Sequence, residues 1–176
     1  YFIFCKEMGH REMTIRTKLQ AILIVLFVFI IGLVGLNFST FNELKGDSPA
    51  VNASGSLRMR AYQLSWLSAR LVSADEEQAA ALRKTMQEYI TTYDRILAGL
   101  EKGDAELNLL PVEDAAVQQQ LAAVKPLWES YRSDVRAVSD AADEETRRTA
   151  DAKVAGEVAS YVAEVNKLVA AYDAAS

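Results

Sequence analysis

Apolar residues recur at helical spacing through four segments of the chain after residue 40. In the segment 82–100 they are separated by steps of three, four or one positions, and the segment 154–172 repeats the same steps. This spacing gives an α-helix one apolar stripe, which a helix bundle buries in its core. The predicted core positions are Leu57, Ala61, Leu64, Leu67 and Leu71; Leu82, Met86, Tyr89, Ile90, Tyr93, Ile96, Leu97 and Leu100; Val117, Leu121, Val124, Trp128, Tyr131, Val135 and Val138; and Val154, Val158, Tyr161, Val162, Val165, Leu168, Val169 and Tyr172.

The segments between these stripes are short and carry signals of helix ends. Residues 73–76 fit a capping box that begins the second helix, and Gly103, Asp104 and Pro111 bracket a loop before the third. The acidic segment 139–145 separates the third helix from the fourth. Short loops between long helices favour an antiparallel up-down four-helix bundle. Glycine and proline are scarce, with 8 and 3 occurrences in 176 residues, so we expect an all-α fold.

Two of the prolines fall where helices are expected. Pro126 lies inside the third stripe, and Pro49 precedes the first. Each removes one helical hydrogen bond, so we expect a kink or a break at both positions. Ser48 and Pro49 could equally be the N-cap and first residue of a new helix.

A longer apolar segment precedes the four stripes. No charged residue occurs from Leu19 to Asn42, and this length can cross the ~30 Å hydrocarbon core of a bilayer. A helix buried in a protein core is the alternative. Basic residues cluster before the segment and predict a cytoplasmic N-terminus. We therefore expect a cytoplasmic segment at 1–18, a transmembrane helix at 19–40 and an outer domain at 41–176.

This topology predicts a single-span protein of the bacterial inner membrane whose outer domain is periplasmic. A cleaved signal peptide would have a shorter apolar run, of ~7–15 residues, and a small-residue cleavage site, which is missing here. Met13 has the features of a natural start, so residues 1–12 are left out of the fold reasoning. The chain is expected to be a fragment that ends before a second transmembrane helix.

Charge and composition exclude several classes of function. The formal net charge of −5 argues against a surface for nucleic acid. The single cysteine, Cys5, and the single histidine, His10, precede the apolar segment, so the outer domain has no disulfide and no thiolate or imidazole metal ligand. We find no catalytic triad and no phosphate-binding glycine loop. We expect no enzyme activity, metal site or cofactor.

The segment 52–64 places an arginine among small residues. If this segment is helical, Ser54, Gly55, Arg58 and Tyr62 share one face, and a second backbone can approach Arg58 closely. A guanidinium on such a face is suited to receive an anion. The alternative interpretation is that Arg58 is an ordinary surface arginine in contact with solvent, as most arginines are. Gly55 costs about 1 kcal/mol in mid-helix relative to alanine, so it is expected to have a structural or binding role.

Several residues of this segment carry a resemblance to a known family. Asp47, Ala50, Val51 and Asn52, then Gly55, Ser56, Leu57, Arg58 and Met59, and finally Tyr62 and Leu64, resemble the P-box of NarX/NarQ-type nitrate/nitrite sensors. Pilus chemoreceptor input domains are related to that family and share its bundle. The resemblance covers about a dozen positions.

The resemblance implies a periplasmic input domain that forms a homodimer and binds nitrate or nitrite between the two box helices. It implies that Arg58 is the anion ligand and Gly55 its backbone partner, and we consider Asn52 and Ser54 as possible supporting residues. Arg60 is left outside the site because it points away from Arg58. In the family the signal passes to a HAMP linker and a histidine kinase, both of which lie outside this chain.

Two alternatives to this function stay open. One is a chemoreceptor-type input domain with another ligand or none, and the other is a structural, membrane-anchored interaction module. The residues do not distinguish nitrate from nitrite, because both are small planar anions.

Overall fold

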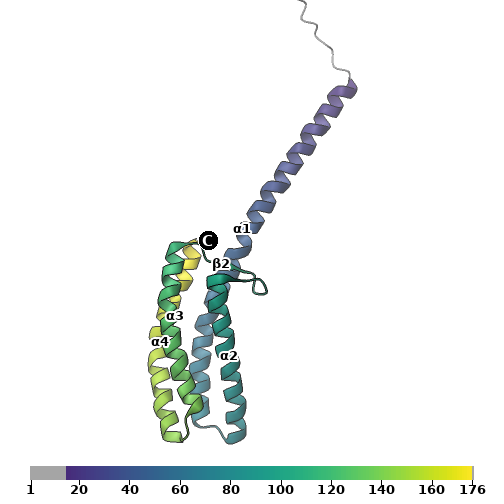
Figure 1. Ribbon diagram of the computed structural model, residues 1–176. Coiled ribbons are helices and arrows are strands. Elements are labelled where there is room, and N and C mark those ends of the chain that lie inside the picture. Colours follow the sequence, from purple (N-terminus) through teal and green to yellow (C-terminus); the bar gives the residue numbers. More distant parts are fainter. Residues whose placement is uncertain (1–14, 176) are drawn as a thin grey trace, which may run out of the picture. The chain divides into compact units, whose positions relative to one another are not determined.

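The computed structural model describes the backbone of residues 15–175 and the side chains of 49–175, together with most of those between 19 and 34. Within these residues it contains the helices α1 (Ile15–Val72), α2 (Glu76–Lys102), α3 (Ala115–Asp140) and α4 (Glu144–Ala175) (Figure 1). Two short strands, β1 (Gly103–Asp104) and β2 (Leu109–Pro111), form an antiparallel hairpin between α2 and α3. The all-α prediction is confirmed, apart from this hairpin.

The chain divides into two compact units, Tyr1–Asn42 and Glu43–Ser176. In the first unit, the large apolar side chains described between Leu19 and Val34 are exposed, which is not the burial that a core helix would show. None of the helices is both long and apolar enough to cross a membrane when only the described residues are considered. The transmembrane helix at 19–40 therefore stays a prediction, and the predicted cytoplasmic segment lies almost entirely outside the described residues.

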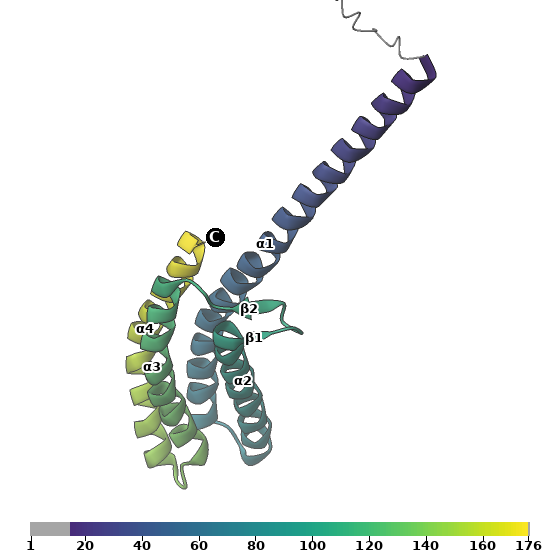
Figure 2. The ribbon, with the colours of Figure 1, turned by 45° about the horizontal axis from the view of Figure 1, so that its top comes forward.

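The second unit buries the predicted stripes. Its helical segments lie side by side, and consecutive helices are joined at alternate ends (Figures 1 and 2). Of the predicted core positions, only Leu82, Tyr89 and Val169 are half-buried, and all the others are buried. Apolar periodicity therefore identified the core correctly.

Two aspartates cap helices at the ends where the loops were expected. Asp75 accepts a hydrogen bond from the Gln78 amide at 2.8 Å, so α2 begins two residues later than a capping box starting at Ser73 would place it. Asp114 accepts from the Val117 amide at 2.9 Å and caps α3. Serine and aspartate both cap helices well, which explains why the spacing alone selected the wrong residue.

Of the two outcomes expected at the prolines, a kink or a break, the break is wrong at both positions. Helix α1 continues through Pro49, and α3 continues through Pro126. A proline removes only one helical hydrogen bond. In α3, Val124 and Trp128 are buried on either side of the exposed Pro126, and this packing holds the helix together.

The hairpin replaces the loop that was predicted before α3. Gly103 has φ +84°, a conformation that side-chain-bearing residues rarely adopt. Arg95 of α2 donates to Asp104 at 2.7 and 3.1 Å and to Glu106 at 2.6 Å, which ties the hairpin to the helix. The hydrogen bonds from Arg95 also lower the pKa of the Asp104 carboxyl.

Four aromatic side chains meet in the middle of the core. Trp128 stacks on Tyr93 with ring centroids 3.7 Å apart, and Tyr131 stacks on Tyr161 at 5.0 Å. The hydroxyls of Tyr93 and Tyr161 hydrogen-bond to each other. Tyr131 donates to the Ala61 carbonyl at 2.9 Å and so joins α3 to α1.

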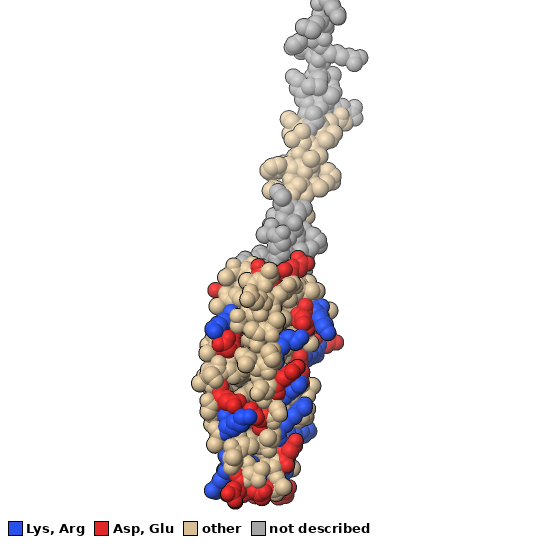
Figure 3. Space-filling model, turned by 60° about the vertical axis from the view of Figure 1, so that its left-hand side comes forward, with Lys and Arg blue, Asp and Glu red and all other residues tan. Residues whose placement is uncertain are grey.

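The face in Figure 3 shows basic and acidic side chains interspersed, with no large patch of one sign.

Candidate functional site

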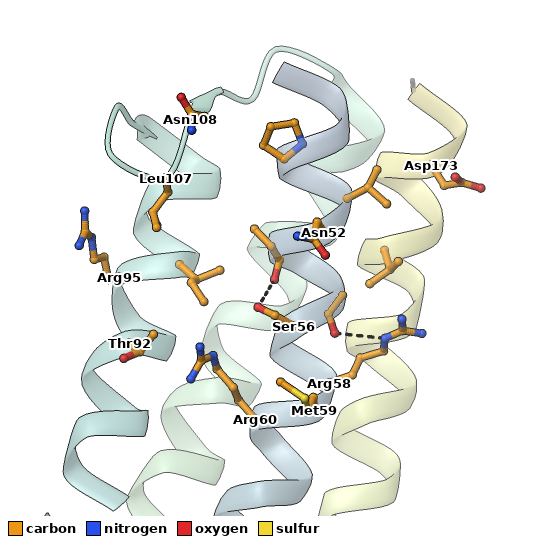
Figure 4. A pocket seen from close by; sticks show the side chains of 16 residues that line it. Asn52, Ser56, Arg58, Met59, Arg60, Thr92, Arg95, Leu107, Asn108 and Asp173 are labelled. Atoms are coloured by element: carbon orange, nitrogen blue, oxygen red, sulfur yellow. Dashed lines mark hydrogen bonds between the residues drawn. The ribbon is translucent and has the colours of Figure 1, made fainter. Parts of the chain in front are cut away.

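A hollow of about 1370 Å³ surrounds the first turns of α1 in the second unit (Figure 4). Its walls come from α1, from α2 and the tip of the hairpin on one side, and from α4 on the other. The polar and charged side chains that line it are Asn52, Ser56, Arg58, Arg60, Thr92, Arg95, Asn108 and Asp173. The predicted site segment therefore lines this hollow.

Arg58 is exposed on α1 and has only neutral acceptors as partners. Its Nη1 donates to Oδ1 of Asn166 on α4 at 3.2 Å, and its Nε approaches the Gly55 carbonyl at 3.5 Å. No carboxylate pairs with Arg58 in the part of the chain that the structure describes. The positive charge is therefore held in place without being neutralised, which leaves it available to an anion.

Gly55 lies directly beside the guanidinium. A Cβ atom at this position would stand 3.6 Å from Nη2 of Arg58, which is an ordinary contact. Within this chain, crowding therefore does not require the glycine. It leaves the helix surface next to Arg58 bare, as a second backbone or a small ligand would need.

The structure brings Asn52 to the same recess but separates Ser54 from it. Asn52 is exposed and lines the hollow. Ser54 is fully buried, and its hydroxyl donates to the Val51 carbonyl at 2.9 Å. Ser54 therefore does not share an exposed face with Arg58, as was predicted. It stands three residues before the buried Leu57 and lies on the same buried stripe of the helix.

Sequence reasoning missed one residue that lines the recess, Arg60, and one partner of a lining residue, Asn166. Asn166 holds Arg58 from 108 positions away, and it is one of many polar residues on the outer surface of α4. Arg60 was set aside, yet it lines the hollow on the side of α2, with its guanidinium 5.7 Å from the Tyr89 ring centre. No local sequence signal marks either residue.

The charged side chains of the recess determine which ligands it can attract. No group of three or more histidine, cysteine, aspartate or glutamate residues could hold a metal ion within the described side chains. The charged side chains that line the recess are those of Arg58, Arg60, Arg95 and Asp173. An anion held by arginine is the chemistry that this arrangement supports.

Helix α1 also carries exposed apolar side chains near the recess. Met59, Tyr62 and Trp66 recur at i, i+3 and i+7 and are 54%, 50% and 58% exposed. The Arg70 guanidinium lies 5.2 Å from the Trp66 ring centre. An apolar stripe of this kind on a helix surface is typical of an association surface.

Comparison with solved structures shows the fold. The chain is similar to the ligand-binding domain of the P. aeruginosa nitrate receptor McpN, with a TM-score of 0.53 and 22% sequence identity over 72% of this chain and 94% of that one. No curated protein sequence matches the chain. The profile of the PilJ family, described as the N-terminal part of type IV pili methyl-accepting chemotaxis transducers, matches residues 39–154. The chain therefore belongs to the PilJ family of chemotaxis-transducer N-terminal domains.

Proposed function

We propose that this chain is the periplasmic input domain of a chemoreceptor-type signalling protein and that it binds nitrate or nitrite at Arg58. The family match favours this function over the NarX/NarQ-type kinase sensor that the P-box resemblance implied. The fold likeness is to a protein named as a nitrate receptor, and the P-box resemblance includes Arg58.

The observation that carries the proposal is the uncompensated guanidinium of Arg58. Both of its partners, the Gly55 carbonyl and the Asn166 amide oxygen, are neutral. Nitrate and nitrite are planar anions, and the planar fork of a guanidinium can donate to two of their oxygens at once. An anion would compete with Asn166 for the Nη1 donor and so weaken the link between α1 and α4.

The proposal includes a homodimer that pairs the α1 helices. The exposed stripe of Met59, Tyr62 and Trp66 provides an apolar surface for this pairing. Two guanidinium ions about 7 Å apart repel each other by roughly 2 kcal/mol at an effective dielectric constant near 20. One anion between them reverses the sign of this interaction, so the ligand would tighten the dimer.

We further propose that residues 19–40 cross the inner membrane once and that residues 41–176 form an up-down four-helix bundle in the periplasm. Helix α1 runs without a break from the apolar segment through Pro49 to Arg58. A shift at Arg58 would therefore be passed along a single helix, and an output domain outside this chain would receive it. The N-terminus would be cytoplasmic.

Thermal unfolding of the full chain in detergent tests the proposal. The melting temperature is measured against nitrate, nitrite, sulfate and chloride at constant ionic strength, for wild type, Arg58→Ala and a control, Arg136→Ala. Arg136 is an exposed arginine of α3 outside the hollow. A ligand present at about 100 times its Kd stabilises the folded state by about 2.7 kcal/mol, which shifts the melting temperature by several degrees.

We expect nitrate or nitrite to raise the melting temperature of wild type and of Arg136→Ala but not of Arg58→Ala. An unchanged nitrate response in Arg58→Ala would show that the site is wrong. The absence of any anion response in a confirmed dimer would instead support a chemoreceptor-type domain with another ligand or none, or the structural interaction module.

A further inference from the structure

Arg60 lies on the opposite side of α1 from Arg58 (Figure 4). It has no ion-pair partner among the described residues. It is half-buried, and its Nε is covered by protein without a hydrogen-bond partner among the described residues. Other arginines of the domain, such as Arg132 with Asp94 at 2.9 Å, pair with carboxylates, whereas no ion pair of Arg60 occurs in the described part of the chain. A half-buried charge in this state is costly unless a ligand compensates it.

The ring of Tyr89 holds the Arg60 guanidinium in place. The guanidinium carbon lies 5.7 Å from the ring centre, within the range of a cation–π contact. Such a contact uses the face of the aromatic ring and consumes none of the N–H donors. Arg60 is therefore positioned while its outer donors stay available to an acceptor.

The hollow is too large for a nitrate site alone. Its volume of about 1370 Å³ exceeds the ~300–1000 Å³ of a typical small-molecule pocket, and a four-atom anion would fill a small part of it. Helix α1 separates two regions within it: Arg58 on the α4 side, and Arg60 with Thr92 on the α2 side (Figure 4).

We propose that the α2 side of the hollow is a second ligand site, which takes a small organic monocarboxylate through Arg60. The carboxylate pairs with the Arg60 guanidinium. The side chains of Met59, Ile96 and Leu107 also line the hollow, and they offer contact to a short apolar tail, which an inorganic anion lacks.

The charges at the rim favour a ligand with a single negative charge. Arg95 also lines the hollow, but Asp104 and Glu106 hold its guanidinium at 2.7 and 2.6 Å. These two carboxylates neutralise Arg95 and repel a second carboxylate on the ligand. Arg60 is thus the anchor of the site, and a dicarboxylate is expected to bind more weakly than a monocarboxylate of the same length.

The test titrates the full chain in detergent with acetate, propanoate, butanoate, pyruvate and benzoate, and with succinate and phosphate for comparison, at constant ionic strength. Calorimetry gives the Kd, and thermal unfolding gives an independent readout. The variants are Arg60→Gln, Arg58→Gln and the surface control Arg136→Gln. Nitrate is titrated in parallel against the same variants.

We expect at least one monocarboxylate to bind wild type, Arg58→Gln and Arg136→Gln with similar affinity and to bind Arg60→Gln at least about tenfold more weakly, as expected for losing a charge-assisted pair. Arg60→Lys keeps the charge without the planar fork and should weaken binding severalfold, which keeps the test valid if Arg60→Gln does not fold. Absence of binding by every monocarboxylate, or binding that depends on Arg58 instead, overturns the proposal. Because Arg58→Gln should weaken nitrate binding while Arg60→Gln leaves it unchanged, failure of either site is detected separately.

Discussion

The paired hydroxyls of Tyr93 and Tyr161 permit a quantitative test of the core. Their side chains come from α2 and α4, and the two residues are 0% and 6% exposed. Phenylalanine at either position keeps the ring, including the stacking of Tyr93 on Trp128, and removes only the oxygen. The hydroxyl pair can therefore be removed one oxygen at a time without creating a large cavity.

A single substitution leaves the other hydroxyl buried without its partner. This costs about 1–3 kcal/mol of the free energy of unfolding, whereas removing both members of a buried pair can be nearly neutral. We therefore expect the Tyr93→Phe/Tyr161→Phe double variant to be at least as stable as either single variant, with a coupling energy of at least about 1–3 kcal/mol. For a domain of this size, 1 kcal/mol corresponds to about 3–4 °C in the melting temperature.

Urea unfolding of wild type, both single variants and the double variant measures the coupling energy. Tyr62→Phe is the matched control, since Tyr62 is 50% exposed and should change stability by less than about 0.5 kcal/mol. Two single effects that simply add in the double variant would refute the reasoning, because they would show that the hydroxyls do not depend on each other.

Three further predictions concern the hairpin, alkaline pH and the anion site. Gly103→Ala should lower the unfolding free energy by about 1–2 kcal/mol, because its φ of +84° disfavours a side chain and the new Cβ would lie 3.0 Å from a proline ring; Gly156→Ala, in open helix, should be neutral or stabilising in the same urea assay. Burial raises the pKa of Tyr172 to about 12 and raises the pKa of three other core tyrosines as well. An unfolded tyrosine ionises near pH 10, so the contribution of these tyrosines to stability should be constant below that pH and fall above it by up to about 1.4 kcal/mol per pH unit for each buried tyrosine; a urea midpoint that is unchanged from pH 9 to pH 12 would contradict this. If Arg58 binds nitrate, Asn166→Ala should tighten binding by up to about fivefold in calorimetry, since the anion no longer displaces an amide acceptor, whereas weaker binding would mean that Asn166 positions Arg58.

The fold was predictable wherever burial imposes a period on the sequence. Every predicted core residue of the first and third stripes is buried, because a helix that packs on one side needs apolar residues every three to four positions. The hairpin at Gly103 was not predicted, since strands of two and three residues are too short to show alternation. The effect of Pro126 was overestimated, because tertiary packing holds a helix that has lost one hydrogen bond.

The site was predictable only in its local part. Arg58 and Gly55 could be identified as candidates from their residue types and their spacing within two helical turns. The assignment of Ser54 to the same face neglected Leu57 and Ala61, which place it on the buried stripe. Asn166 and Tyr89 contact the two arginines of the recess, Arg58 and Arg60, through tertiary interactions, and a single sequence carries no signal for pairs that distant.

The two tryptophans of this chain occupy contrasting environments, so their intrinsic fluorescence can report on two different parts of the protein. Trp128 is buried, stacks on Tyr93 and donates from its indole to Asp94 at 2.6 Å, so its emission should be blue-shifted until the core unfolds. Trp66 is 58% exposed on α1, so its emission should be red-shifted until another surface covers it. Replacing one tryptophan at a time with phenylalanine would give two spectra, one that follows the integrity of the core and one that follows events on the outer face of α1.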